Sequence, residues 1–246
     1  MKRRRLGQHY LIDSSVRDRM ISLAQIRPSD SILEIGTGRG ELTSALTERG
    51  NSVVGYEVDR DNFLETRRRV KSPKLTLHMK DVFEEKPSFD VLVASLPYSR
   101  SGDFIEWLSM LKYRRAVVLL QQDFVKKITS GPGENGYRAV SVIAQISSNI
   151  EVHSKVGMSS FDPRPKVGSS IVSFTPKSTM TESEIRVLKK LFALRRRTLG
   201  AVLRETGIEL DATEILLGSR LGSLSPETIH GLLDRAVQNK RSSALE

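Results

Sequence analysis

The chain has 246 residues, no cysteine and a net charge of +10, which suits one large domain or a medium domain with a small one. The lack of cysteine excludes disulfides, thiolate catalysis and cysteine-bound metal, and the four histidines show no metal-ligand spacing, so no metal is expected. No apolar run reaches the ~18 residues of a membrane span, and the basic N-terminus lacks the apolar segment of a secretory signal. We therefore expect a cytoplasmic protein without membrane association.

Short β-branched runs alternate with helical patterns from about residue 31 to residue 174. The first five runs are apolar with little alternation, as strands buried on both faces are. The last two runs follow each other closely, which suits an antiparallel hairpin at a sheet edge. The pattern predicts an α/β fold with a parallel sheet. Its predicted strands are residues 31–35, 52–57, 75–78, 91–94, 116–121, 151–158 and 169–174, and its helices include 41–49, 61–70 and 101–111.

The character of the chain changes after Pro176. Thr181 and Glu184 are spaced as a capping box that opens a helix, and apolar residues then recur near helical spacing. Two further helical patterns follow, at 212–218 and 226–237. We therefore predict two domains, with the sheet in residues 1–177 and a small all-helical domain in residues 178–246.

A glycine-rich turn follows the first predicted strand. Gly36, Gly38 and Gly40 stand in the order G-x-G-x-G, where they let the backbone turn tightly and approach a ligand closely. Glu57 ends the second strand, in the position that accepts hydrogen bonds from ribose hydroxyls. A plain strand–helix turn with a strand-end acid is the alternative. Position, glycine number and acid together favour a nucleoside site.

Glu34 indicates which nucleoside is bound. Enzymes that bind NAD space their glycines G-x-G-x-x-G to bring a helix N-terminus to a pyrophosphate, and Glu34 would repel that group. The same acid suits a cationic amino-acid tail, so the predicted cofactor is S-adenosylmethionine, and a NAD-dependent dehydrogenase is disfavoured. Asp81, after the third strand, is placed to accept from the adenine amine, although alone it is more typical of a helix N-cap.

The fourth strand ends in Ser95-Leu96-Pro97-Tyr98, at the end of the sheet where ligands bind. Tyr98 offers a face for stacking, and the Ser95 hydroxyl and Leu96 carbonyl offer acceptors. Pro97 stiffens the turn. These groups suit a planar base with an exocyclic amine, flipped out of its helix. Acceptors for the amine hydrogens would direct its lone pair at the methyl group and stabilise the developing charge. A strand end with a packing tyrosine is the alternative.

Basic residues cluster in four places along the chain. For any single cluster a solvated face is the simpler interpretation. Four clusters on so basic a chain favour a polyanionic partner, nucleic acid first. The clusters are residues 2–5, residues 67–69 with Lys71 and Lys74, Lys112 with Arg114 and Arg115, and residues 195–197.

The motifs together resemble the small-subunit ribosomal RNA adenine dimethyltransferases, the KsgA family, and its archaeal members in particular. The resemblance covers nearly the whole length. Residues 6–11, LGQHYL, resemble the family's cofactor-capping motif, and residues 161–167 are close to its F-x-P-x-P-K-V motif; these two are the most specific. Further matches are residues 34–43, Glu57, Asp81 with Val82, residues 137–142, and residues 195–199, which resemble R-R-K-T-L.

The resemblance implies a Rossmann-like class I methyltransferase sheet in residues 1–177 and an RNA-binding helical domain in residues 178–246. It implies an enzyme that dimethylates adenosines near the 3′ end of small-subunit rRNA, on the rRNA or the immature small subunit, during ribosome biogenesis. A monomer is the expected state. The implied catalytic residues are Ser95, Leu96, Pro97, Tyr98 and Phe161, where the family's phenylalanine lines the target-base pocket. The implied cofactor-binding residues are Gln8, His9, Leu11, Glu34, Gly36, Gly38, Gly40, Glu57, Val58, Asp81, Val82 and Ser95.

Ser95 departs from the family pattern, which is N-L-P-Y at this corner. Serine still accepts a hydrogen bond, but its oxygen lies one bond closer to the backbone. Among amino-methyltransferases this position holds Asp, Asn or Ser, and serine is common in those that methylate the cytosine amine of DNA. Monomethylation, a cytosine N4 target and a mainly non-catalytic assembly factor are therefore the alternatives. The intact Tyr98, Phe161 and cofactor residues argue against the last of these.

Overall fold

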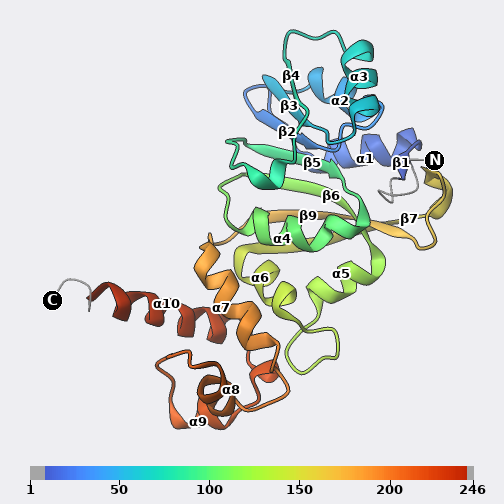
Figure 1. Ribbon diagram of the computed structural model, residues 1–246. Coiled ribbons are helices and arrows are strands. Elements are labelled where there is room, and N and C mark those ends of the chain that lie inside the picture. Colours follow the sequence, from blue (N-terminus) through green and yellow to red (C-terminus); the bar gives the residue numbers. More distant parts are fainter. Residues whose placement is uncertain (1–8, 243–246) are drawn as a thin grey trace. The chain divides into compact units, whose positions relative to one another are not determined.

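The structure is a computed structural model that describes residues 9–242, with side chains to residue 234 (Figure 1). It divides into two compact units, of which the first comprises Met1–Val125 and Asn149–Pro176 and the second Lys126–Ser148 and Lys177–Glu246. Gln8 and the basic cluster at residues 2–5 lie outside the described residues.

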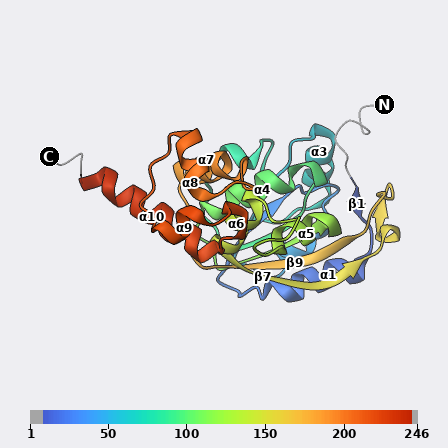
Figure 2. The ribbon, with the colours of Figure 1, turned by 90° about the horizontal axis from the view of Figure 1, so that it is seen from below.

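The first unit is built on a seven-stranded sheet of order β4-β3-β2-β5-β6-β9-β7. The pairs from β4 to β6 are parallel, and β9 runs antiparallel to β6. Each predicted strand is present, and the last two lie together at one edge, where Figure 2 shows β7 beside β9. The strands are β2 (Ser31–Ile35), β3 (Ser52–Tyr56), β4 (Leu75–His78), β5 (Val91–Ser95), β6 (Arg115–Gln121), β7 (Ser148–Val156) and β9 (Ser169–Pro176).

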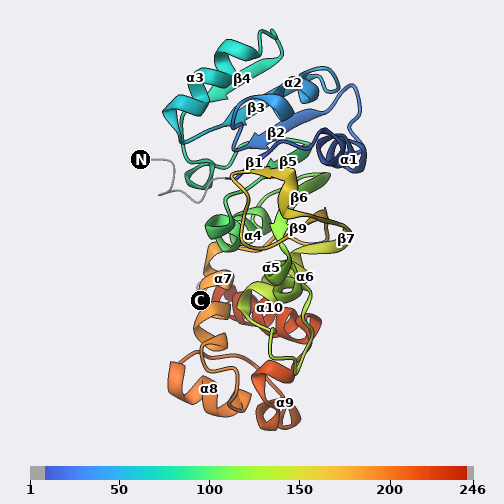
Figure 3. The same ribbon diagram turned by 90° about the vertical axis from the view of Figure 1, so that its right-hand side faces the viewer.

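Helices cover both faces of this sheet, which explains why its central strands are apolar on both sides. In Figure 3, α1 (Ser14–Ala24) lies on one side of the stacked strands and α4 (Ser101–Ser109) on the other. Asp13 caps α1 by accepting from the backbone N–H groups of Ser15 and Val16. The remaining helices here are α2 (Glu41–Thr47), α3 (Arg60–Arg69) and α5 (Gln122–Thr129), of which α5 continues into the second unit.

A second, two-stranded sheet joins the N-terminal segment to the segment before β9. Strand β1 (Tyr10–Leu11) pairs antiparallel with β8 (Phe161–Asp162), so that Leu11 lies opposite Phe161. The described residues also form four short 3₁₀ turns, which are η2 (Val82–Glu84), η3 (Tyr98–Arg100), η4 (Met158–Ser160) and η5 (Leu221–Ser223).

The second unit is helical. The predicted capping box is present, because Thr181 accepts from the Glu184 backbone N–H and Glu184 accepts from that of Thr181. Tyr137 packs its ring against Phe192 and donates its hydroxyl to the Leu224 carbonyl at 3.0 Å. Its helices are α6 (Ala139–Ser147), α7 (Glu182–Phe192), α8 (Leu199–Thr206), α9 (Glu214–Gly218) and α10 (Pro226–Ser242).

The observed division of the chain differs from the predicted one at residues 126–148. The prediction placed these residues with the sheet. They belong to the helical unit, where α6 packs against α7 and α10. The reason is the composition of α6, AVSVIAQIS, which is apolar around most of its circumference and therefore needs helical neighbours on more than one side. No helix in the described part of the chain has the length and apolar character needed to cross a membrane.

Candidate active site

A pocket in the first unit opens at the carboxyl ends of β2, β3 and β5, where open α/β sheets bind ligands. It joins the glycine loop, the acid after β3, the corner after β5 and the N-terminal segment. The predicted residues that line it are His9, Leu11, Glu34, Gly36, Gly38, Glu57, Val58, Asp81, Val82, Ser95, Leu96 and Pro97. Gly40, Tyr98 and Phe161 are not among its lining residues.

The glycine loop adopts the left-handed backbone that its sequence predicts. Gly36, Gly38 and Gly40 have φ angles of +75°, +56° and +86°, which favour glycine strongly. A Cβ at Gly38 would lie 3.4 Å from the Tyr10 ring, and one at Gly40 would lie 3.3 Å from the Thr66 backbone. Gly38 is therefore favoured by its backbone conformation rather than by lack of space, while Gly40 also lets α3 pack closely behind the loop.

Glu57 holds the glycine loop in place at the floor of the pocket. Its side chain is 5% exposed, and its two oxygens accept from the backbone N–H groups of Gly38 and Asp59 at 3.0 and 2.9 Å. Burial raises the pKa of this carboxyl. Each carboxylate oxygen can accept a second hydrogen bond, which fits the two hydroxyls of a ribose.

Glu34 is fully buried at the end of β2 and lines the same pocket. Neither of its carboxyl oxygens makes a hydrogen bond of ordinary geometry among the described residues, although the neighbouring Thr43 hydroxyl lowers the pKa of Glu34 against the larger effect of burial. Burial raises the pKa of Glu34 to about 8. A buried carboxylate without a partner costs free energy, and a cationic group in the pocket would offset that cost. The residues present therefore fit the ammonium group of S-adenosylmethionine.

Three residues of the pocket were not among the predicted site residues, and they are Tyr10, Arg39 and Asn62. The Tyr10 hydroxyl donates to the Asn62 side chain at 3.0 Å, and the Arg39 guanidinium lies 4.6 Å from the centre of the Tyr10 ring. All three residues line the pocket. Tyr10 lies within the LGQHYL motif, so the motif itself was a signal for it, whereas Arg39 and Asn62 have no signal beyond their place beside the glycine loop.

Asp81 has the capping role that was its alternative interpretation. One carboxylate oxygen accepts from the Phe83 backbone N–H at 3.0 Å and starts η2, and the other accepts from Arg100 at 2.9 Å. The Arg100 guanidinium also lies 4.6 Å from the centre of the Phe83 ring. Arg100 lies two residues after Tyr98 and lines the pocket, yet no sequence motif pointed to it.

The S-L-P-Y corner lies where β5 ends and η3 begins. Tyr98 is fixed at two points, because its hydroxyl shares a 2.8 Å hydrogen bond with that of Ser169 and its ring centre lies 5.5 Å from that of His9. His9 in turn donates to the Pro163 carbonyl at 2.6 Å. Burial raises the pKa of Tyr98, so the phenol stays neutral and serves as a surface rather than a base.

Phe161 lies in a different environment from the one predicted. Its side chain is 3% exposed and packs in the hydrophobic core of the first unit, in a cluster that includes Met20 and Ile171 and is flanked by Leu11. The alternation of β8 explains this, because it turns Phe161 inward and Asp162 outward. The predicted place of Phe161 in the target-base pocket is therefore not supported by its burial. Among the residues that the structure describes, no cluster of three or more His, Asp or Glu side chains could hold a metal ion.

The sheet order, the antiparallel β9 and the glycine loop with its two buried acids define a class I S-adenosylmethionine-dependent methyltransferase. The family model described as ribosomal RNA adenine dimethylase matches residues 1–237. A probable ribosomal RNA small subunit methyltransferase A of Pyrococcus abyssi is 34% identical over 212 residues, which cover 86% of this chain and 79% of the relative. The chain therefore belongs to the ribosomal RNA adenine dimethylase family, as the resemblance predicted.

Two solved structures agree with this fold. The crystal structure of a dimethyladenosine transferase from Plasmodium falciparum superposes with a TM-score of 0.79 at 24% identity, covering 91% of this chain and 96% of its own. The 23S rRNA methyltransferase ErmE gives a TM-score of 0.65 at 22% identity and covers 92% of this chain and 99% of its own.

Proposed function

We propose that this protein transfers methyl groups from S-adenosylmethionine to the exocyclic amine of adenosines near the 3′ end of small-subunit rRNA, and dimethylates them during ribosome biogenesis in the cytoplasm. One observation supports this most strongly. A single pocket joins two buried acids suited to the cofactor, Glu34 and Glu57, to the Ser95-Leu96-Pro97 corner suited to an amine.

The cofactor-binding roles follow from the chemistry of each side chain. Glu57 accepts from the ribose hydroxyls, and Glu34 pairs with the ammonium of the amino-acid tail. Asp81 keeps acceptor capacity for the adenine amine beside its bonds to Phe83 and Arg100, and the exposed Val58, which lines the pocket, offers an apolar surface for the adenine ring. S-adenosylmethionine supplies an electrophilic methyl group on its sulfonium.

The target-binding roles lie at the corner after β5. Tyr98 offers its ring to the flipped adenine, and its bond to Ser169 fixes the plane of that ring. The Ser95 hydroxyl and the Leu96 carbonyl accept the two amine hydrogens, which directs the nitrogen lone pair towards the methyl group. The same acceptors stabilise the charge that develops on nitrogen. The proton leaves after transfer, so this step needs no strong base.

The helical unit supplies an RNA-binding surface in this proposal, and the protein acts on the rRNA of the immature small subunit as a monomer. Arg197 is engaged in an ion pair with Glu205. Arg195 and Arg196 are the cations of this cluster that we assign to phosphate contacts, because Arg196 is exposed and Arg195 half-buried beside it.

Nucleoside analysis tests the proposed function directly. The protein is incubated with labelled cofactor and unmodified small ribosomal subunits, and the methylated nucleosides are identified by mass spectrometry, with fully methylated subunits as the control substrate. We expect N6,N6-dimethyladenosine from the unmodified subunits and no label in the control. Methylcytosine as the product would establish the cytosine N4 target, which the serine at position 95 makes an alternative. Subunits that bind the protein tightly but acquire no label would establish a mainly non-catalytic assembly factor.

A further inference from the structure

The arginines and lysines of the basic clusters fall into two groups, those that pair with an acidic side chain of the protein and those that do not. Arg114 forms a 2.5 Å ion pair with the buried Asp30, and Arg115 lies 3.5 Å from Glu151 while donating to the Leu23 carbonyl. Both arginines of this third basic cluster therefore have roles within the first unit. The cluster at residues 67–74 is different.

The residues of this cluster surround the end of α3 and the start of β4. Arg69 forms a 2.6 Å ion pair with Glu41. The other four cations are exposed, and no acidic side chain in the described residues lies within ion-pair distance of them. We name these four the α3 basic face, and they are Arg67, Arg68, Lys71 and Lys74.

Two of these cations are fixed in place by neutral groups. The Lys71 ammonium donates to the Arg67 carbonyl at 3.0 Å, and the Lys74 ammonium donates to the Gly50 carbonyl at 2.9 Å. A carbonyl orients the ammonium without neutralising its charge. The helix dipole accounts for cations in the last turn of α3, but Lys74 lies beyond that turn, at the start of β4.

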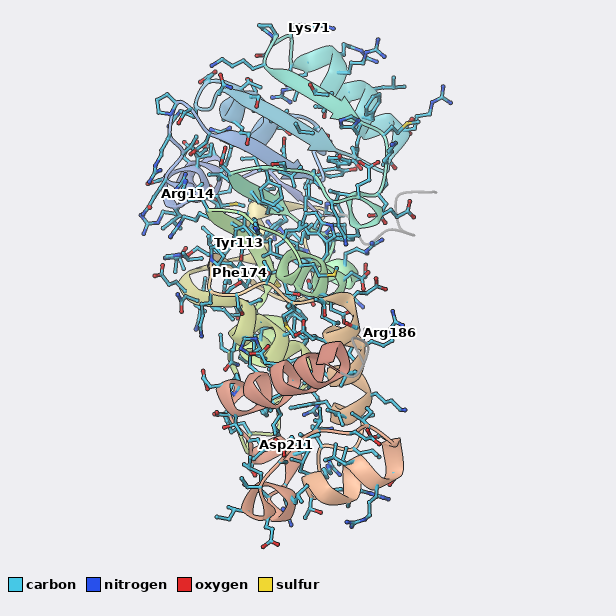
Figure 4. All side chains as sticks on the ribbon, turned by 90° about the vertical axis from the view of Figure 1, so that its left-hand side faces the viewer. Lys71, Tyr113, Arg114, Phe174, Arg186 and Asp211 are labelled. Carbon is cyan, nitrogen blue, oxygen red and sulfur yellow. The ribbon has the colours of Figure 1, made fainter. Side chains whose placement is uncertain are left out.

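A shallow hollow lies between these cations. It is lined by Phe63, Arg67, Val70, Lys71, Ser72, Leu75 and Leu77. Two of the four cations, Arg67 and Lys71, line it together with Ser72 and four apolar side chains. The hollow lies at the free edge of the sheet, because β4 is the outermost strand. Figure 4 shows Lys71 projecting from this end of the first unit.

We propose that the α3 basic face is a second RNA-binding surface, which holds the phosphate backbone of structured rRNA on the unit that contains the catalytic pocket. The proposal rests on the proposed function, since it assigns that substrate a further contact. Exposed cations without acidic partners match a phosphate backbone, and two of them border a hollow that a backbone segment can enter. Such contacts carry no sequence information, so they hold the RNA in register while the corner after β5 reads the base.

Matched variants test this surface. One replaces the α3 basic face with glutamines, and its control removes the same number of exposed arginines and lysines elsewhere on the first unit. Glutamine keeps a donor, so the variants should fold, and thermal melting and cofactor affinity check that they do. The variant is Arg67→Gln, Arg68→Gln, Lys71→Gln, Lys74→Gln, and the control is Arg19→Gln, Arg27→Gln, Lys112→Gln, Lys155→Gln.

Binding to unmodified small subunits and to the protein-free 3′ segment of their rRNA is measured over a range of salt. We expect the α3 variant to bind both about tenfold or more weakly at ~0.15 M salt, with a salt slope smaller by about two to three. The control should change its slope by less than about one. The KM of the α3 variant for subunits should rise while its kcat stays near the parent value, because the α3 basic face lies outside the catalytic pocket.

Two results would overturn this proposal while leaving the proposed function intact. Equal behaviour of the two variants would mean that the α3 basic face is only a solvated surface. Weaker binding to subunits with unchanged binding to bare rRNA would assign the face to an acidic ribosomal protein. If the parent protein itself failed to bind or methylate either substrate, the proposed function would fail first.

Discussion

The candidate site has two halves, which differ in how far their polar groups are satisfied. The cofactor half is the part of the pocket that holds Glu34 and Glu57, and the target half is the S-L-P-Y corner, whose Tyr98 lies outside the pocket lining. In the cofactor half, neither oxygen of the buried Glu34 makes a hydrogen bond of ordinary geometry among the described residues. In the target half, Tyr98 is hydrogen-bonded to Ser169 and contacts His9, which is itself bonded to Pro163. The cofactor half therefore contains a buried carboxyl that a cationic ligand would ionise and pair, whereas the target half is held by bonds within the protein.

This difference predicts different consequences of mutation. Substitutions in the cofactor half remove partners of the ligand, so they should change affinity for the cofactor. Substitutions at the corner alter a surface that exists before any base arrives, so they should change turnover and leave cofactor affinity alone.

Phe161→Ala should destabilise the fold by about 3–5 kcal/mol, because it empties a site in the core where Phe161 is 3% exposed. Denaturation in urea measures the loss. The family resemblance would instead predict a loss of turnover at unchanged stability. That result would return Phe161 to the target pocket and show that its ring is reachable by the base.

Glu57→Ala should weaken cofactor binding by about 2–3 kcal/mol, because two ribose hydroxyls lose their acceptors in a buried site. This corresponds to roughly 30- to 150-fold in the dissociation constant, and isothermal titration calorimetry measures it. Glu41→Ala serves as the control, since Glu41 also lines the pocket but pairs with Arg69. Equal affinity of the parent and Glu57→Ala would remove Glu57 from the ribose site.

Tyr98→Ala should slow turnover, because it removes an aromatic stacking surface that typically contributes about 1–3 kcal/mol of free energy. Cofactor affinity should stay near the parent value. Tyr98→Phe separates the two roles of the side chain, because it keeps the stacking face and loses the bond to Ser169. We expect an intermediate rate from it. Parent-like turnover by Tyr98→Ala would make Tyr98 a packing residue.

Glu34→Gln should change how stability depends on pH. The pKa of Glu34 is raised to about 8 in the folded protein without cofactor, so between the unfolded value and about 8 the folded state binds the extra proton. Its stability therefore falls as pH rises through that window. The parent's Tm should fall more steeply than that of Glu34→Gln from about pH 5 to about pH 8. Parallel curves would contradict the raised pKa.

The Glu34 carboxyl should give cofactor affinity the opposite pH dependence to that of stability. A bound ammonium favours the ionised form of Glu34, so cofactor affinity in the parent should increase as pH rises towards about 8. Glu34→Gln should bind weakly and lose this dependence. Calorimetry at several pH values, with correction for the buffer's heat of ionisation, measures both effects.

The sequence predicted what depends on local pattern. Apolar runs predicted the strands, and the spacing of Gly36 and Gly38 with Glu34 and Glu57 predicted residues that one pocket brings together, because each lies at or just after a strand end. The capping box at Thr181 was predictable for the same reason.

The rest depends on contacts between distant segments. The bonds of Tyr98 to Ser169 and of Asp81 to Arg100 join residues that no local pattern connects. The grouping of residues 126–148 with the helical unit follows from the packing of α6, which its neighbours decide. Phe161 was placed by resemblance to a motif, and the motif does not say which way β8 turns its side chains.

Ser95 is where the corner departs from the family, and its effect should appear in the second methyl transfer. The shorter side chain holds one amine hydrogen loosely or through water, which directs it less well. Ser95→Asn should therefore speed the second transfer, provided the pocket accommodates the larger side chain.

A time course of mono- and dimethyladenosine in unmodified small subunits, measured by mass spectrometry for the parent and for Ser95→Asn, tests the account most directly. We predict that the parent forms dimethyladenosine through a visible monomethyl stage, and that Ser95→Asn shortens that stage. Methylcytosine as the product would contradict the assigned substrate. Prompt dimethylation by the parent with an inactive Ser95→Asn would show instead that the corner is built around serine.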